Sequence, residues 1–258
     1  KISVGATANV LMAAVLAEGV THIKNAAIEP EITSLINFLN IMGAKINGKN
    51  TAHLIVEGVK KLNSVAMNMI PDRIEAGTFL LAGAITKSRI TVANCCPEHL
   101  QALNEKLIEA GCDLNITETA IEIIPPQKIR PVNISAIPHP GFPTDLQAQF
   151  MSFMTLSEGE CEIEDTVFPD RFMHVSELNR LDADIETYAN KAIVKGVESL
   201  SGAEVMATDL RASAALVLAG LAAQGETTIS RIYHIDRGYE HIERKLTGIG
   251  ADIKRVQS

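Results

Sequence analysis

The chain has 258 residues, of which 47% are hydrophobic and 21% are charged, and its formal net charge is −8. This composition is typical of a globular protein of one or two domains, and the negative charge does not favour binding to nucleic acid. The sequence contains no apolar run long enough to span a membrane and no recognisable secretory signal. Four cysteines without metal-ligand spacing indicate buried, reduced thiols and a reducing compartment such as the cytoplasm: Cys95, Cys96, Cys112 and Cys161.

The first residues, Lys1-Ile2-Ser3-Val4-Gly5, lack a methionine and lead directly into a helix that we predict for residues 8–17. A glycine at a helix N-terminus leaves backbone N–H groups free to hold a phosphate, and Lys1 would add a positive charge. An ordinary strand-to-helix turn explains the same residues, so both interpretations stay open. Because the chain starts inside its first structural unit, we expect a fragment of a longer protein.

A connector over residues 60–71 leads into a second unit. Asp72 and Glu75 predict a capping box for a helix that runs through Leu81. Cys95, Cys96 and Pro97 then occupy the loop between a strand and the following helix.

A proline-rich passage from Pro125 to Pro143 precedes the third unit. Thr144 and Gln147 predict another capping box, and Asp145 falls in the first helical turn, where the helix dipole stabilises a carboxylate. Capping alone explains Asp145 as well as a functional role does.

Two later loops repeat the dipeptide Asp-Arg, in Val167–His174 and in His234–Gly238. Arg171 and Arg237 belong to these loops, and Arg211 lies in a first helical turn, where the dipole disfavours a cation. Arginines placed against local preference predict a bound anion, since guanidinium groups match phosphate and carboxylate. The alternative is a set of scattered surface ion pairs.

The last unit shows the repeating pattern most completely. Residues 208–222 predict a helix ended by Gly225, residues 227–232 a strand, 239–246 a second helix, and 251–256 another strand. The same order occurs four times, with equivalent turn positions roughly every 70 residues. These positions are Gly19, Ser88, Gly159 and Gly225.

Specific motifs extend over nearly the whole chain: SVGAT, PDRIEAGTF, PHPGFPTDLQAQF, TVFPDRFMHVSEL, GAEVMATDLRASAALVLAG and RIYHIDRGYEHIE. With them the chain resembles the bacterial UDP-N-acetylglucosamine enolpyruvyl transferases, which move enolpyruvate from phosphoenolpyruvate to the sugar 3′-hydroxyl at the start of peptidoglycan synthesis. The resemblance implies an α/β fold, an inside-out α/β barrel with six repeats in two domains. Four repeats are expected here: residues 1–70 as the last repeat of the first domain, and 71–258 as the second domain.

The resemblance also implies roles for individual residues. It assigns the diphosphate of the nucleotide sugar to Lys1, Ser3, Val4 and Gly5, and a further cleft position to Glu29. It makes Asp145 the carboxylate that binds the 3′-hydroxyl and takes its proton, with sugar and uracil contacts from Thr144, Val167 and Phe168. The wall facing phosphoenolpyruvate is assigned to Arg171, Asp209, Arg211 and Arg237.

The resemblance implies no cofactor and no metal, and small-molecule substrates together with the missing N-terminal half as partners. None of the four cysteines matches the family's mobile-loop cysteine, so we expect an enzyme as the parent protein and an inactive chain alone. Two alternatives stay open. One is a non-catalytic repeat scaffold that binds an anion, and the other is a relative of the shikimate-pathway enolpyruvyl transferase, which shares the repeat but not this set of motifs.

Overall fold

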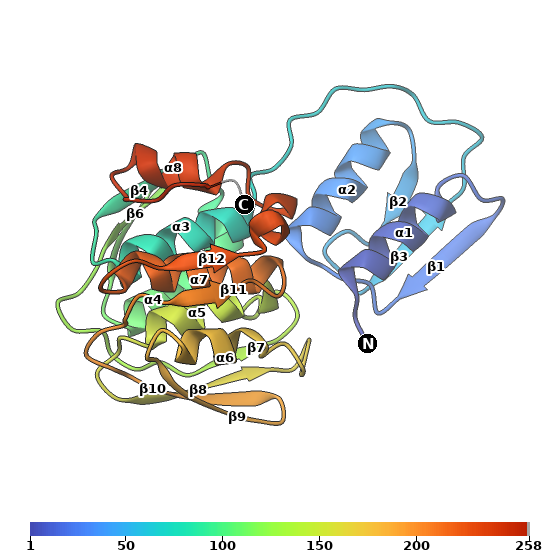
Figure 1. Cartoon of the computed structure of the whole chain (residues 1–258). Coiled ribbons are helices and arrows are strands. Elements are labelled where there is room, and N and C mark those ends of the chain that lie inside the picture. The colour runs from blue at the N-terminus through green and yellow to red at the C-terminus, as the bar shows by residue number, and fades with distance from the viewer. Residues whose placement is uncertain (257–258) are drawn as a thin grey trace. The chain divides into compact units, whose positions relative to one another are not determined.

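The structure is a computed structural model, and it describes residues 1–256. It divides into two compact units, shown in Figure 1. The first contains Lys1–Pro71 and Pro138–Gly141, and the second contains Asp72–Ile137 and the residues from Phe142 onward. Assigning these units to two domains of a longer protein stays a prediction.

Unit 1 has two helices and an antiparallel sheet with the strand order β1-β3-β2. Its elements are α1 (Val4–Ala14), β1 (Val20–Lys24), α2 (Pro30–Ile41), β2 (Lys45–Asn47) and β3 (His53–Glu57). Leu11 from α1, Ile36 from α2 and Val56 from β3 are buried together in its core. The predicted start of the first helix was four residues late, because the Ser3 side chain caps the helix by accepting from the Ala6 N–H at 3.2 Å.

Unit 2 contains the remaining repeats. Its helices are α3 (Arg73–Ile85), η1 (Pro97–Leu100), α4 (Gln101–Glu109), η2 (Thr144–Leu146), α5 (Gln147–Met154), α6 (His174–Asn179), α7 (Leu210–Ala222), η3 (Ile232–Arg237) and α8 (Ile242–Gly248). Its strands are β4 (Ile90–Ala93), β5 (Asp113–Ile116), β6 (Ala120–Ile124), β7 (Ile134–Ala136), β8 (Glu160–Asp165), β9 (Asp184–Tyr188), β10 (Lys191–Lys195), β11 (Glu204–Met206) and β12 (Thr228–Ser230).

The strands of unit 2 form three separate sheets within the described residues, with the orders β4-β6-β5, β7-β8-β10-β9 and β11-β12. Helices α3, α5 and α7 pack against one another in the middle of the unit, and the sheets lie outside them (Figure 1). Helices inside and strands outside confirm the predicted α/β fold with an inside-out arrangement. The most complete unit runs β7-α5-β8-α6-β9-β10, with β7 and β8 parallel and the other pairs antiparallel.

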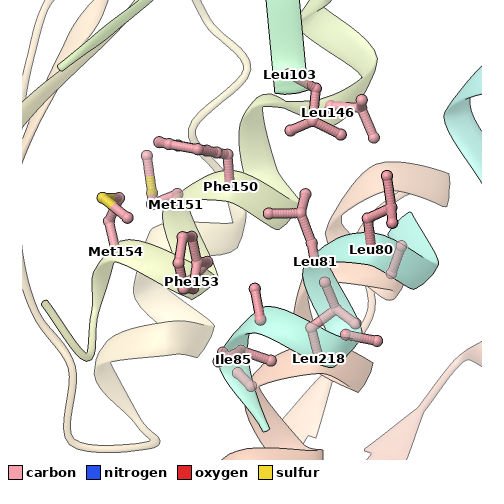
Figure 2. Close-up of a cluster of buried hydrophobic side chains, with 14 of the residues drawn as sticks. Leu80, Leu81, Ile85, Leu103, Leu146, Phe150, Met151, Phe153, Met154 and Leu218 are labelled. Atoms are coloured by element: carbon pink, nitrogen blue, oxygen red, sulfur yellow. The ribbon is translucent and has the colours of Figure 1, made fainter. Parts of the chain in front are cut away.

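The core of unit 2 is built where α3, α5 and α7 meet. Figure 2 shows Leu81 and Ile85 of α3, Phe150 and Phe153 of α5, and Leu218 of α7 within one buried cluster. Every residue of α5 is buried, which fits a helix that is apolar on most of its surface. Small residues allow the close approach of the helices: a Cβ added to Gly77 would lie 2.6 Å from a Leu146 methyl carbon.

In both units, the residue after a strand contacts the backbone that follows a helix. Gly58 follows β3, and a Cβ added there would lie 1.5 Å from the Ala17 carbonyl oxygen. Gly196 follows β10 and makes the same approach to the Ser157 carbonyl, at 1.7 Å. Only glycine fits such a contact, because any side chain would overlap the carbonyl.

Of the two predicted capping boxes, the one formed by Asp72 and Glu75 is only partly present. Asp72 caps α3 by accepting from the N–H groups of Ile74 and Glu75, as predicted, while the Glu75 carboxylate binds Lys245 at 2.6 Å. The box of Thr144 and Gln147 is wrong. Thr144 donates its hydroxyl proton to Asp165, and the amide oxygen and nitrogen of Gln147 are buried without a hydrogen-bond partner in the part of the chain that the structure describes.

The predicted strand at residues 251–256 is also wrong, because this segment is neither strand nor helix. A strand needs a neighbouring strand for its backbone hydrogen bonds, and no strand of residues 1–256 pairs with the segment. Its side chains attach it instead: Ile253 packs on the core, and Arg255 binds Asp236.

The four cysteines are free, and Cys95, Cys112 and Cys161 are buried, as predicted, whereas Cys96 is only partly buried. Burial raises the pKa of the Cys112 thiol to about 12 and that of the Cys161 thiol to about 11. In the described part of the chain, none of the helices has the length and apolar character needed to cross a bilayer.

Candidate active site

Asp145 of η2 is bound by two arginines that are distant in the sequence. Arg171, in the loop between β8 and α6, donates from Nη1 to Asp145 Oδ1 at 2.8 Å. Arg211, in the first turn of α7, donates from Nη2 to Asp145 Oδ2 at 2.8 Å. The fold of unit 2 thus brings three of the predicted site residues to one point.

The two guanidinium groups control the charge of this carboxyl. Burial raises the pKa of Asp145, but the charges and hydrogen bonds of Arg211 and Arg171 together outweigh burial and hold the pKa below the ordinary value of aspartate. The side chains are 35%, 25% and 15% exposed for Asp145, Arg171 and Arg211, so the ion pairs lie at the boundary of the core and are open to solvent on one side. Asp145 is therefore an ionised carboxylate at neutral pH.

Asp165, at the end of β8, is fully buried and organises the loop that follows. Its carboxylate accepts from the Thr144 hydroxyl at 2.5 Å and from the N–H groups of Val167 at 2.9 Å and Phe168 at 2.7 Å. Asp165 was not among the predicted site residues. Its position offers one local signal: an aspartate at the end of an alternating strand and before a turn commonly accepts hydrogen bonds from backbone N–H groups two or three residues later.

The loop fixed by Asp165 positions Arg171. The Arg171 guanidinium lies 4.7 Å from the ring centroid of Phe168, and it also donates to Thr144 Oγ1 at 3.0 Å. The Phe168 side chain is 49% exposed, which leaves an aromatic face in solvent beside the ion pairs. Thr144, Val167, Phe168 and Arg171 thus form one connected cluster around Asp165, and their assignment to the site stays a prediction.

Asp209 has a local role. Its Oδ1 caps α7 by accepting from the N–H groups of Arg211 at 2.7 Å and Ala212 at 3.0 Å. Asp209 and Asp145 therefore supply the negative charge that allows Arg211 to occupy the positive end of a helix. The nearby His174 is buried, and burial lowers its pKa to about 4 despite the charge of Asp209, so it is neutral at pH 7.

A network of buried polar side chains binds the backbone of η2. Gln149 Nε2 donates to the Asp145 carbonyl oxygen at 2.9 Å and to the Tyr239 hydroxyl oxygen at 3.2 Å. The Thr78 hydroxyl donates to the Ile74 carbonyl, so the Tyr239 hydroxyl must donate to Thr78 Oγ1 across 2.8 Å. The network joins α3, α5 and the segment after η3, and sequence analysis missed all three side chains.

Arg237 does not join the Asp145 cluster. It lies exposed at the end of η3 and makes no ion pair within residues 1–256. Asp236, the residue before it, binds Arg255, at 2.5 and 3.2 Å. Asp145 supplies the compensation for Arg171 and Arg211.

The remaining predicted residues lie in unit 1. Ser3, Val4 and Gly5 form the start of α1, and a Cβ added to Gly5 would meet nothing within 4 Å, so the space beside this backbone is open. Lys1 lies two residues before Ser3. Glu29 precedes α2 without capping it, and its buried Oε2 has no hydrogen-bond partner among residues 1–256.

The described residues contain no cluster of three or more histidine, cysteine, aspartate or glutamate side chains that could hold a metal ion. The groups at the site are one carboxylate, two guanidiniums, a hydroxyl and an aromatic ring. Such a set can bind an anion and accept a proton.

A model of the EPSP synthase (3-phosphoshikimate 1-carboxyvinyltransferase) family matches residues 1–246. The chain belongs to this family. It is 55% identical over 99% of its length to the UDP-N-acetylglucosamine 1-carboxyvinyltransferase of Bdellovibrio bacteriovorus, of which it covers 62%. It is 56% identical to the protein of the same name from Hydrogenovibrio crunogenus, of which it covers 61%. The chain thus spans about three fifths of the length of these relatives.

Solved enolpyruvyl transferases share the fold. The enolpyruvyl transferase NikO from Streptomyces tendae superposes with a TM-score of 0.88 at 27% identity, over 97% of this chain and 60% of NikO. The EPSP synthase of Acinetobacter baumannii gives a TM-score of 0.75 at 18% identity, over 99% and 62% of the two chains, which shows the shared fold alone. These similarities confirm the predicted fold and the resemblance to the enolpyruvyl transferases.

Proposed function

We propose that the full-length protein transfers enolpyruvate from phosphoenolpyruvate to the 3′-hydroxyl of UDP-N-acetylglucosamine, the first committed step of peptidoglycan synthesis. Relatives that are 54–56% identical carry the name of this activity. The structural observation that carries the proposal is the binding of Asp145 by both Arg171 and Arg211. The free cysteines fit a reducing compartment, and we place the reaction in the cytoplasm.

The proposed reaction uses the carboxylate and the guanidiniums differently. The sugar 3′-oxygen forms a bond to C2 of phosphoenolpyruvate as its proton passes to Asp145, and C3 gains a proton from a general acid or water, so that the C2–C3 double bond becomes a single bond. In the following elimination C3 loses a proton, the C2–oxygen bond to phosphate breaks, and the double bond is restored as phosphate leaves. Arg171 and Arg211 bind the anionic groups of phosphoenolpyruvate, since guanidinium pairs well with both phosphate and carboxylate. Both partners are small molecules, and neither nucleic acid nor membrane is needed.

The geometry of the cluster suggests how Asp145 becomes a better base. With both oxygens bound by guanidiniums, its pKa is lowered and its affinity for a proton is small. An arriving phosphate or carboxylate competes for Arg171 and Arg211, and withdrawing their charges raises the pKa of Asp145. Anion binding thus makes the carboxylate basic at the moment when a proton must be accepted.

The other predicted residues have proposed roles in each unit. We assign the sugar and uracil to Thr144, Val167 and Phe168, and the phosphoenolpyruvate-facing wall also to Asp209 and Arg237. In unit 1, the diphosphate is assigned to Lys1, Ser3, Val4 and Gly5. The unpartnered buried oxygen of Glu29 supports a ligand contact there.

Release of phosphate from phosphoenolpyruvate in the presence of UDP-N-acetylglucosamine tests the proposal with the full-length gene product. Asp145→Asn is expected to lower kcat by about 10²- to 10⁴-fold, the usual contribution of a general base. Asp184→Asn makes the same change on exposed β9 and should leave kcat unchanged. Full activity in Asp145→Asn, or transfer only to 3-phosphoshikimate, would overturn the proposal, and the latter would favour the shikimate-pathway alternative.

Anion binding by the 258-residue chain separates the arginine cluster from the complete reaction. Phosphate should raise the melting temperature of the parent more than that of Arg211→Ala, and Arg244→Ala, an exposed arginine of α8, should respond like the parent. Equal responses in all three would show that Asp145 and its arginines do not bind anions. Binding without any transferase activity in the full-length protein would favour the anion-binding scaffold.

A further inference from the structure

The outer face of the unit 1 sheet carries two histidines on neighbouring strands. Exposed and buried positions alternate in both strands, so that His22 of β1 and His53 of β3 face solvent while Ile23 and Leu54 face the core. The strands are antiparallel, with Lys24 opposite His53 and His22 opposite Ile55. The two histidines are therefore diagonal neighbours on one face of the sheet.

Their rings are close enough to interact directly. His22 Nδ1 lies 3.1 Å from His53 Nε2, with ring centroids 5.3 Å apart and ring planes inclined by 30°. A hydrogen bond at this distance needs a proton on one nitrogen and a lone pair on the other. If both protons instead occupy the outer ring nitrogens, two lone pairs are brought within 3.1 Å of each other.

We propose that His22 and His53 form a binding site for one divalent transition-metal ion of borderline softness, such as Zn²⁺ or Ni²⁺. Imidazole nitrogens bind such ions at about 2.0–2.1 Å. Two nitrogens 3.1 Å apart then subtend an angle of about 100° at the ion, between the angles of octahedral and tetrahedral coordination. Because both side chains are exposed, small rotations can direct the lone pairs to a common point.

Water molecules must complete the coordination, since the described residues offer no third protein ligand in the same cluster. The nearby charges set the strength of the site. Lys24 lies opposite His53 and repels a cation, and Glu57, diagonal to His22 on the other side, is bound by Lys45. The site is therefore weaker than a buried metal centre, and replacing Lys24 with a carboxylate should strengthen it.

Binding would connect β1 to β3 through the metal. An ion that binds the folded state stabilises it by mass action, so unit 1 should become more resistant to unfolding as the free metal concentration rises. This effect lies wholly within unit 1 and does not depend on the proposed transferase activity.

Isothermal titration of the tag-free 258-residue chain with Ni²⁺ tests the site, in a Cys96→Ser background because this cysteine is only partly buried. The parent should bind one ion. His22→Gln and His53→Gln should each raise the dissociation constant at least about tenfold, since one ligand loses the effective concentration supplied by the other. Lys24→Glu should lower the dissociation constant. His241→Gln, which removes another exposed histidine, should leave it unchanged.

Two outcomes would overturn the proposal: no binding by the parent at millimolar Ni²⁺, or unchanged affinity in either His22→Gln or His53→Gln. Broadening of NMR signals by Ni²⁺ provides the second measurement. It should be strongest at the rings of His22 and His53 and at the intervening backbone of β1 and β3. Broadening centred on another part of the chain would assign the bound ion elsewhere and contradict the site.

Discussion

At the scale of single residues, Asp145 depends on its two arginines for its charge state. Replacing Arg211 with alanine removes one hydrogen bond and one positive charge, so we expect the pKa of Asp145 to rise. The pKa is measured by following the chemical shift of the Asp145 carboxyl carbon by NMR as a function of pH. Arg244→Ala serves as the control and should give the parent titration curve.

The same shift affects stability. A carboxyl whose pKa is lowered by folding stabilises the protein above the unfolded-state pKa, and this contribution is lost as the pH falls through the lower folded value. Asp145→Asn should therefore destabilise the chain at pH 7, by about 1 kcal/mol for partly exposed ion pairs. The difference from the parent should disappear in strong acid, and a difference that persists there would contradict the assigned cause.

Asp165 is expected to be more important for folding than Asp145, because it is fully buried and accepts three hydrogen bonds. Asp165→Asn replaces an acceptor oxygen by an amide donor beside two backbone N–H groups. We expect a loss of about 2–3 kcal/mol in the free energy of unfolding, measured by urea denaturation. The exposed Asp184→Asn should change it by less than about 0.5 kcal/mol.

The sequence located Asp145, Arg171 and Arg211 without showing that they meet, since 26 and 66 residues separate the partners. Thr144 shows why local patterns fail here. Its position satisfied a capping rule, but its hydroxyl is taken by a carboxylate 21 residues away. The Thr78–Tyr239 contact, 161 residues apart in the sequence, has no local signal at all.

At the scale of elements, the packing of α3 against η2 depends on Gly77. A methyl group there would lie 2.6 Å from Leu146 Cδ1 and 3.0 Å from Leu103 Cδ2. Gly77→Ala should destabilise unit 2 by about 1–3 kcal/mol, the usual cost of overpacking a core. Thermal unfolding measures this loss of stability. Gly248→Ala in α8 meets nothing within 4 Å and should not destabilise the chain; equal losses in both would exclude overpacking as the reason.

Helices were easier to predict than strands. Apolar spacing and the Asp72 cap located α3, because both signals act within a few residues. The segment 251–256 has the alternation of a strand, yet strand formation depends on a partner that local sequence does not reveal. The absence of a pairing strand among residues 1–256 therefore leaves residues 251–256 without strand structure.

At the scale of the whole molecule, the connector between the units is a predicted site of proteolysis. Residues 58–72 contain no helix or strand and include Lys60 and Lys61. Limited trypsin treatment should cut there first, because proteases need an extended and accessible backbone. Mass spectrometry of the early products identifies the sites, and first cuts within α3, α5 or α7 would contradict the division into units.

The glycine contacts after β3 and β10 make strand and helix inseparable within a repeat. Gly58 and Gly196 rest directly on the backbone that follows α1 and α5, the first helix of each repeat, and the residues after them, Val59 and Val197, donate to the Val15 and Thr155 carbonyls. Neither partner can move without breaking the bonds of the other. Local opening therefore proceeds repeat by repeat, and each repeat behaves as one cooperative foldon rather than as a helix and a hairpin that fray independently.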